Sequence, residues 1–382
     1  MTREPSPDPL HEPLHEPLRE PSGEPSREHV AATVREQADA CGRLGSPLYA
    51  ALLHRVAGDI TADGPCAEAL AGYVGSPGPD AVALRLLGGV HALVLTGRAP
   101  ELAAYYPSAG GRFAPTGPEA AWPAFRAVVA ANLPWVRDWL TRPPQTNEVG
   151  RANLLITGLL RVLPAGPLPV RLFELGSSAG LNLLADRFHC TAGSFAYGPA
   201  DSPVQLQDAW QDAPPGWLPE AAAAHPALGF AERHGCDLTP IDPASPDGAL
   251  ALRAYVWPDQ EARTARLAGA LELAAEHPAD VRAVGAADFL RGVTVRPGTL
   301  TVVWHSIMRQ YVPKDEWDAV EGELARLAEA STPAAPFAYI AFEPLRPGSG
   351  HRFVLTVRAG AGPVEVLAEA LPHGLPARPF RP

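Results

Sequence analysis

The 382-residue chain has few cysteines, and those it has are far apart. Its four cysteines, Cys41, Cys66, Cys190 and Cys236, form no C-x-x-C pair, which argues against a structural zinc site. Scattered cysteines in a chain of this length are typical of buried thiols in a reducing compartment. We therefore expect no metal site and no disulfide framework.

Long hydrophobic runs and an excess of basic charge are also lacking. The most apolar stretch, residues 81–97, is interrupted by Arg85 and His91, whereas a membrane span needs about 20 apolar residues in a row. The N-terminus lacks the order of a signal peptide, and 31 basic against 42 acidic residues give a net charge of −11. This charge disfavours nucleic acid and membranes as partners. We expect a cytoplasmic protein with a small-molecule substrate and predict no oligomeric state.

Proline and glycine are abundant and divide the chain into short segments. The 44 prolines and 35 glycines make up about a fifth of the residues, which predicts short helices and many turns. Residues 1–27 repeat a four-residue unit that ends in proline and starts at Leu10, Leu14 and Leu18. Such a repeat can form neither a long helix nor a core, so we interpret it as a disordered, dispensable tail.

Two different patterns follow this tail. Apolar residues at three- and four-residue spacing predict helices within 34–60, 81–105 and 122–140, so residues 28–165 are predicted to form an all-helical domain. In residues 166–382, short apolar runs alternate with helical segments. This alternation predicts an α/β fold, with a Rossmann-like sheet, helices on both faces and an antiparallel hairpin at one edge. The predicted strands are 170–175, 281–285, 300–304, 337–342, 352–358 and 364–368, and the predicted helices are 181–188, 258–276 and 314–330.

The most informative segment is Glu174-Leu-Gly-Ser-Ser-Ala-Gly-Leu-Asn182, a glycine turn between a predicted strand and a predicted helix. One interpretation is a nucleophile elbow, G-x-S-x-G, in which Ser178 of a serine hydrolase attacks the substrate. Against it, the turn follows the first strand of the sheet, and no loop that would supply an oxyanion hole precedes it. Candidate partners for Ser178 are Asp242, Asp288, His305, His351 and His373.

The second interpretation is a loop that binds a nucleoside cofactor. Gly176 permits the turn, the small residue Ser178 lets the backbone approach a ligand, and Gly180 lets the next helix pack on the strand. The N–H groups that begin this helix suit a carboxylate, and Glu174 suits a cationic amine. Because an acid at this place would repel a pyrophosphate, the combination favours S-adenosylmethionine over a dinucleotide.

The same segment resembles motif I of class I S-adenosylmethionine-dependent methyltransferases, with serine in place of the middle glycine. This resemblance covers about residues 168–382 and implies a methyltransferase-like sheet. It also implies which residues hold the cofactor. The methionine end would contact Glu174, Gly176, Ser178, Gly180 and Asn182, the ribose Asp237 or Asp242, and the adenine Asp288.

From about residue 30 the chain is also similar to the uncharacterised bacterial domain-of-unknown-function family 2332. The similarity rests on residues 45–49, 145–148, 174–182, 255–259, 305–306 and 310–311. It supports the architecture and implies no reaction. The connection between the first helix and the second strand is longer than usual, which predicts an insertion at about residues 190–235.

Further polar residues are candidates for the substrate site. Asn147, Glu148 and Arg151 precede a predicted helix, and we weigh equally a helix cap and a turn that lies over the cofactor. His305 follows a central strand, where residues face the ligand crevice of such sheets, so we predict that it is the general base. Tyr106 and Tyr311 are further candidates for substrate binding.

The favoured activity is methyl transfer from S-adenosylmethionine to a small molecule. One alternative keeps the fold and assigns it a hydrolysis, a cyclisation or ligand binding alone. The other alternative is the serine hydrolase that uses Ser178.

Overall fold

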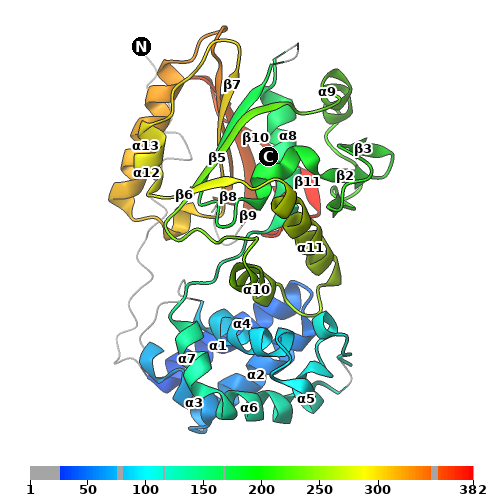
Figure 1. The fold of residues 1–382 in the computed structure, drawn as a ribbon, viewed down its shortest axis with the longest axis vertical. Helices are drawn as coiled ribbons and strands as arrows, with labels where there is room; N and C mark the ends of the chain where they lie inside the picture. Colours follow the sequence, from blue (N-terminus) through cyan, green and yellow to red (C-terminus); the bar gives the residue numbers. More distant parts are fainter. Residues whose placement is uncertain are drawn as a thin grey trace, which may run out of the picture.

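The computed structural model describes residues 26–74, 81–114, 117–164, 166, 168–345 and 352–381. The predicted tail therefore lies almost wholly outside the described residues. Between Arg27 and Val162 the described chain forms helices, and strands begin at Val170. Figure 1 shows the helices between Arg27 and Leu140 grouped below the sheet, with the later helix α10 (Pro246–Ala254) between the two parts.

The first helices enclose a core of their own. Ser46 caps the start of α2 and Pro47 occupies its first position, a combination that favours helix initiation. Leu52, Leu53 and Val56 of this helix are fully buried. The α-helices of this part are α1 (Arg27–Arg43), α2 (Pro47–Thr61), α3 (Pro65–Ala69), α4 (Val82–Leu95), α5 (Pro100–Ala103), α6 (Trp122–Ala131) and α7 (Leu133–Leu140). The next helix, α8 (Ala152–Val162), packs on the sheet instead. Short 3-10 helices are η1 (Ala71–Tyr73), η3 (Pro107–Ala109), η4 (Pro118–Ala121) and η5 (Val149–Arg151).

An eight-stranded sheet forms the second part, in the order β11-β10-β9-β8-β7-β1-β5-β6. The five strands from β8 to β6 are parallel, and β8 to β11 pair antiparallel. The prediction of an α/β fold is confirmed at this level. The strands are β1 (Val170–Leu175), β5 (Phe230–Asp237), β6 (Asp280–Ala283), β7 (Leu300–Ser306), β8 (Phe337–Leu345), β9 (Arg352–Ala359), β10 (Glu365–Ala370) and β11 (Ala377–Pro379).

Helices cover both faces of this sheet (Figure 1). Val170 and Leu172 of β1 pack on the face that α8 and α11 (Glu261–Glu276) cover. Phe173 and Leu175 pack on the opposite face, against α12 (Ala286–Arg291) and α13 (Lys314–Glu329). All six residues of β1 are buried, as expected for a central parallel strand, and Glu174 is one of two charged residues among them.

The predicted helix 181–188 is a 3-10 helix, η6 (Leu181–Arg187). Gly180 precedes it in a left-handed conformation, no side chain caps it, and the backbone angles of Leu184 depart from helical values. The chain enters another strand at His189.

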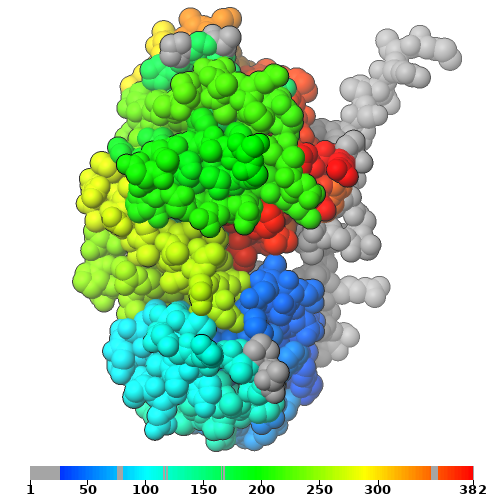
Figure 2. All heavy atoms as spheres, turned by 90° about the vertical axis from the view of Figure 1, so that its right-hand side faces the viewer, coloured from blue at the N-terminus to red at the C-terminus, as the bar shows by residue number. Residues whose placement is uncertain are grey.

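An additional small sheet lies within the predicted insertion. Its strands are β2 (His189–Ala192), β3 (Phe195–Tyr197) and β4 (Gln205–Leu206), in the order β3-β2-β4, and α9 (Leu218–Ala224) follows. Figure 2 shows these residues, in green, covering one face of the molecule above the first helices. No helix in the described ranges has the length and hydrophobicity that a membrane span requires.

Candidate functional site

The glycine loop follows the central strand β1, at the edge where the parallel strands end. Gly176, Ser178 and Gly180 all have positive φ angles, of 65°, 54° and 70°. A Cβ atom on Gly180 would lie 2.7 Å from Cγ2 of Val281, so only glycine lets this turn approach β6 so closely. In open α/β sheets, ligands bind outside this edge, next to the strand where the order reverses.

Residues 145–147 lie directly on this loop. The backbone N–H of Leu181 donates to Oδ1 of Asn147 at 2.8 Å, and the Ser178 hydroxyl donates to Oε1 of Gln145 at 2.9 Å. From the other side, Asp237 accepts from the N–H of Ser178 at 2.9 Å. The side chains of Asn147 and Asp237 thus accept backbone N–H groups of the loop. A ligand's carboxylate oxygens could accept from the same N–H groups.

Ser178 has no base beside it. Its hydroxyl donates to an amide oxygen, which cannot accept a proton to activate the serine. The candidate partners have other contacts: Asp242 accepts from the N–H of Ala244, Asp288 pairs with Arg291, His305 bonds to Glu343 and Tyr339, and His373 neighbours Glu148. His351 lies outside the described residues. Ser178 thus has the positive φ angle of an elbow turn, but the described residues supply no base to activate its hydroxyl.

Two buried acceptor atoms beside the loop have no donor among the described residues. Glu174 is 2% exposed, and its Oε1 accepts from Nε1 of Trp304 at 3.1 Å, whereas its Oε2 has no partner. The neighbouring Asn182 donates weakly to the carbonyl of Glu148, and its Oδ1 has no partner among the described residues. Its side chain also lies close enough to Glu174 to lower the pKa of that carboxyl, against the larger effect of burial. Burial raises the pKa of Glu174 to about 8. A carboxyl with this pKa is largely protonated at neutral pH, and a cationic donor at this place would stabilise its ionised form.

A buried ion cluster surrounds Glu148. Its Oε2 accepts from Nε of Arg263 at 2.6 Å, its Oε1 accepts from the N–H of Gly150 at 3.2 Å, and the imidazole of His373 lies 3.6 Å away. Burial alone raises the pKa of Glu148, but the charge of Arg263, followed by other cationic neighbours, outweighs it and holds the pKa at about 2. Glu148 is therefore ionised at neutral pH.

Arg151 links three segments beside this cluster. Its Nε donates to the carbonyl of Pro372 and its Nη1 to that of Ser306, both at 3.0 Å. It also lies near enough to Glu174 for its charge to lower the pKa of that carboxyl, against the larger effect of burial. A cavity of 140 Å³ opens beside Glu148 and Arg151, between the first helices and the sheet.

Comparison with protein-family models gives one match over residues 31–378, to DUF2332, described as uncharacterised proteins conserved in bacteria. The chain belongs to this family. The match confirms the similarity recognised in the sequence and brings no reaction with it. Neither the curated proteins nor the solved structures that were compared include a match.

The predicted general base of this DUF2332 protein lies away from the loop. His305 is fully buried, and its ring nitrogens bond to Oε1 of Glu343 at 2.8 Å and to the hydroxyl of Tyr339 at 2.5 Å. It packs against Trp317 on the α13 face, whereas Glu174 lies on the opposite face. The strand continues to Ser306, so His305 is a core residue rather than the first residue beyond the strand. This geometry does not support the general-base hypothesis.

The remaining predicted residues are more scattered. Tyr106 is fully buried in the core of the first helices, against His91, and does not line the cavity, so the structure gives no support to substrate binding there. Tyr311 is 63% exposed and lies close enough to influence the pKa of Arg151. Asp242 and Asp288 are exposed, and their roles towards the ribose and adenine stay predictions.

Trp304 and Arg263 lie around the site and were not predicted, because no local motif marks them. His373 was considered only as a partner for Ser178, and Tyr49 only as part of the family segment 45–49. Among the described residues, no group of three or more metal-ligating side chains occurs.

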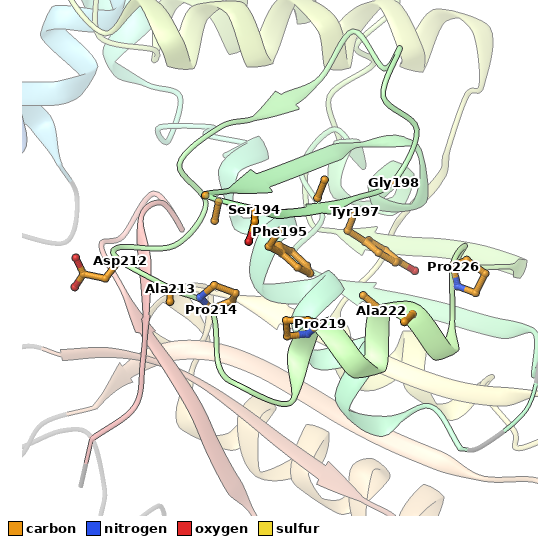
Figure 3. A pocket seen from close by; sticks show the side chains of 14 residues that line it. Ser194, Phe195, Tyr197, Gly198, Asp212, Ala213, Pro214, Pro219, Ala222 and Pro226 are labelled. Atoms are coloured by element: carbon orange, nitrogen blue, oxygen red, sulfur yellow. The ribbon is translucent and has the colours of Figure 1, made fainter.

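A second, larger cavity of 680 Å³ lies in the insertion. Figure 3 shows Phe195 and Tyr197 projecting from β3 towards Pro219 and Ala222 of α9. Its only ionisable lining residues are Tyr197, whose hydroxyl donates to the carbonyl of His225, and Asp212. This lining lacks the converging charges that catalysis requires, so the loop after β1 is the better candidate.

Proposed function

We propose that this DUF2332 protein binds S-adenosylmethionine at the loop 176–180 and transfers the methyl group to a small molecule. The observation that carries the proposal is the buried Glu174 carboxyl, whose Oε2 lies beside this loop and, like Asn182 Oδ1, has no partner among the described residues. The methionine end of the cofactor has an ammonium group that would supply such a donor. Its carboxylate would compete with Asn147 for the N–H of Leu181.

The arrangement of the strands gives further support. Counted along the chain, the five parallel strands lie in the order third, second, first, fourth, fifth, so the loop follows the strand at which the order reverses. The resemblance to class I methyltransferases implies this order. A methyltransferase-like domain over 166–382, preceded by a helical domain over 28–165, is therefore part of the proposal.

The roles of the acids are assigned with this geometry in view. Both carboxylate oxygens of Asp237 accept backbone N–H groups, those of Ser178 and Thr239, so Asp237 positions the loop whether or not it also meets the ribose. Asp242 remains the alternative for the ribose, and Asp288 the candidate for the adenine. Methyl transfer is a displacement that depends mainly on positioning, which suits a site without an adjacent base.

A second candidate keeps the same ligand site without methyl transfer. The two candidates share the prediction that S-adenosylmethionine binds, and differ in whether any acceptor is methylated.

Isothermal titration calorimetry with S-adenosylmethionine and S-adenosylhomocysteine tests the proposal. We expect both to bind the wild type, and Glu174→Gln to weaken binding by about 1–3 kcal/mol, the range of a charge-assisted hydrogen bond. The control is Glu365→Gln, an exposed acid that pairs with Arg161. If the wild type binds neither compound, or both variants bind equally well, the assignment of this loop is wrong.

A further inference from the structure

The cavity beside Glu148 is built from both parts of the molecule. Its volume is 140 Å³, close to that of cavities of about 150 Å³ that accept one benzene molecule. It lies next to the loop, because Thr146 in its wall stands between Gln145 and Asn147, which bond to Ser178 and Leu181. The wall consists of Tyr49, Leu84, Gly88, Pro144, Thr146, Glu148, Arg151, Ala254, Tyr255, Trp257, Arg263 and His373.

The charges in this wall leave one positive charge in excess. Arg263 is paired with Glu148, whose second oxygen accepts from Gly150, so this pair is already satisfied. Burial lowers the pKa of His373 to about 3, which keeps its imidazole neutral. The charge of Arg151 is the one that no carboxylate in the wall neutralises directly.

Arg151 is also held in a fixed orientation. Its Nε and Nη1 donate to the carbonyls of Pro372 and Ser306, and its Nη2 has no acceptor among the described residues. Because two carbonyls already fix this guanidinium, an anion that binds its remaining N–H groups costs little further side-chain entropy. This favours the binding of an anion whose oxygens match the positions of those N–H groups.

Two more polar groups in the wall lack partners. The hydroxyl of Tyr49 is buried and has none among the described residues, and neither has Nε2 of His373. Such groups are rare in native structures unless a ligand or water satisfies them. The rings of Tyr49, Tyr255 and Trp257 supply flat apolar surface around these groups. The cavity thus combines one cation, two unsatisfied polar atoms and aromatic walls.

We propose that this cavity binds a compact monocarboxylate with a single ring, whose carboxylate meets Arg151 and whose ring lies against the aromatic wall. That this monocarboxylate is the methyl acceptor rests on the function proposed above. The volume limits the enclosed part of the ligand to about one benzene ring. A second negative charge would face Glu148, so dianions are disfavoured.

Benzoate and its neutral counterpart benzamide are suitable probes. We expect calorimetry to show benzoate binding to the full chain, and benzamide binding at least tenfold more weakly. Arg151→Gln should abolish benzoate binding. The matched control is Arg161→Gln in the following helix α8, because Arg161 is half-exposed, pairs with Glu365 and does not line the cavity.

A second pair of variants covers the case in which loss of Arg151 prevents folding. Thr146 lines the cavity but is exposed, so Thr146→Trp should block the cavity without disturbing the core. Thr141→Trp, at an exposed position outside the cavity, should leave benzoate binding unchanged. Equal affinity for benzoate and benzamide, or benzoate binding that survives Thr146→Trp, would overturn the proposal.

The two proposals fail separately. If S-adenosylmethionine binds and benzoate does not, the cavity proposal is wrong and the cofactor site stands. If benzoate binds with the expected dependence on Arg151 and S-adenosylmethionine does not, the cavity is an anion site and the methyltransferase proposal is wrong.

Discussion

The side chain of Glu174 should make the stability of the protein depend on pH. Burial raises the pKa of its carboxyl from 4.5 to about 8 in the folded chain, so the folded state binds this proton more tightly than the unfolded state. The free energy of unfolding should therefore fall as the pH rises from about 4.5 to about 8, and stay level above that. At about 1.4 kcal/mol per pKa unit, the full decline reaches about 5 kcal/mol as an upper limit.

Glu174→Gln isolates this contribution, because glutamine has nearly the same shape and does not ionise. We expect the variant to lack the decline, so its stability relative to wild type should increase between pH 5 and pH 8. Urea unfolding followed by tryptophan fluorescence at each pH measures the difference. Glu365→Gln, which alters an exposed carboxylate, serves as the control.

One outcome of these unfolding measurements would refute the raised pKa of Glu174. Parallel stability profiles for wild type and Glu174→Gln across this range would show that the Glu174 carboxyl is already ionised near pH 5, which contradicts our account of its burial. A second measurement connects stability with function. With S-adenosylmethionine at saturating concentration, the bound cation should favour the ionised carboxylate, and the decline of the wild type should become smaller.

Two further predictions concern neighbouring residues. Glu148→Gln should destabilise the protein by about 3–5 kcal/mol in urea unfolding, because it leaves the buried Arg263 without its counter-charge; a loss below 1 kcal/mol would mean that the cluster is well solvated. Ser178→Ala should change the affinity for S-adenosylmethionine less than twofold in calorimetry, because alanine also fits the turn and only the bond to Gln145 is lost. An esterase activity that Ser178→Ala abolishes would instead restore the hydrolase interpretation.

The parts of the fold that the sequence predicted best are those with strong local signals. The bounds of β1 match the prediction, because an apolar run with proline before it and Gly176 after it defines both ends. The strand β11, at Ala377–Pro379, was missed because its three residues include no apolar run; it is defined by its pairing with β10. The start of β5 at Phe230 was missed for a similar reason, since Glu232 and Arg233 interrupt its apolar pattern.

The candidate site was predictable only where its residues are near one another in the sequence or belong to a recognisable motif. The glycine loop and residues 145–151 were singled out, and their contact through Asn147 and Leu181 agrees with one of the two interpretations of that segment. Glu148 and Arg263 are 115 residues apart, and no periodicity links them. A buried ion pair of this kind depends on how α11 packs beside the sheet, which the local pattern does not specify.

Trp304 and His305 show why position along a strand was not enough to assign a base. Residues 300–305 of β7 are all buried, so polarity does not mark which face of the strand meets the ligand edge. Because successive side chains point to opposite faces, the pairing of β7 with β1 decides the matter. That pairing places the indole of Trp304 on Glu174 and turns His305 towards Trp317 and Tyr339. The residue that contacts the candidate cofactor site is therefore the tryptophan, which holds Glu174 in place, whereas the histidine holds Glu343 on the other face.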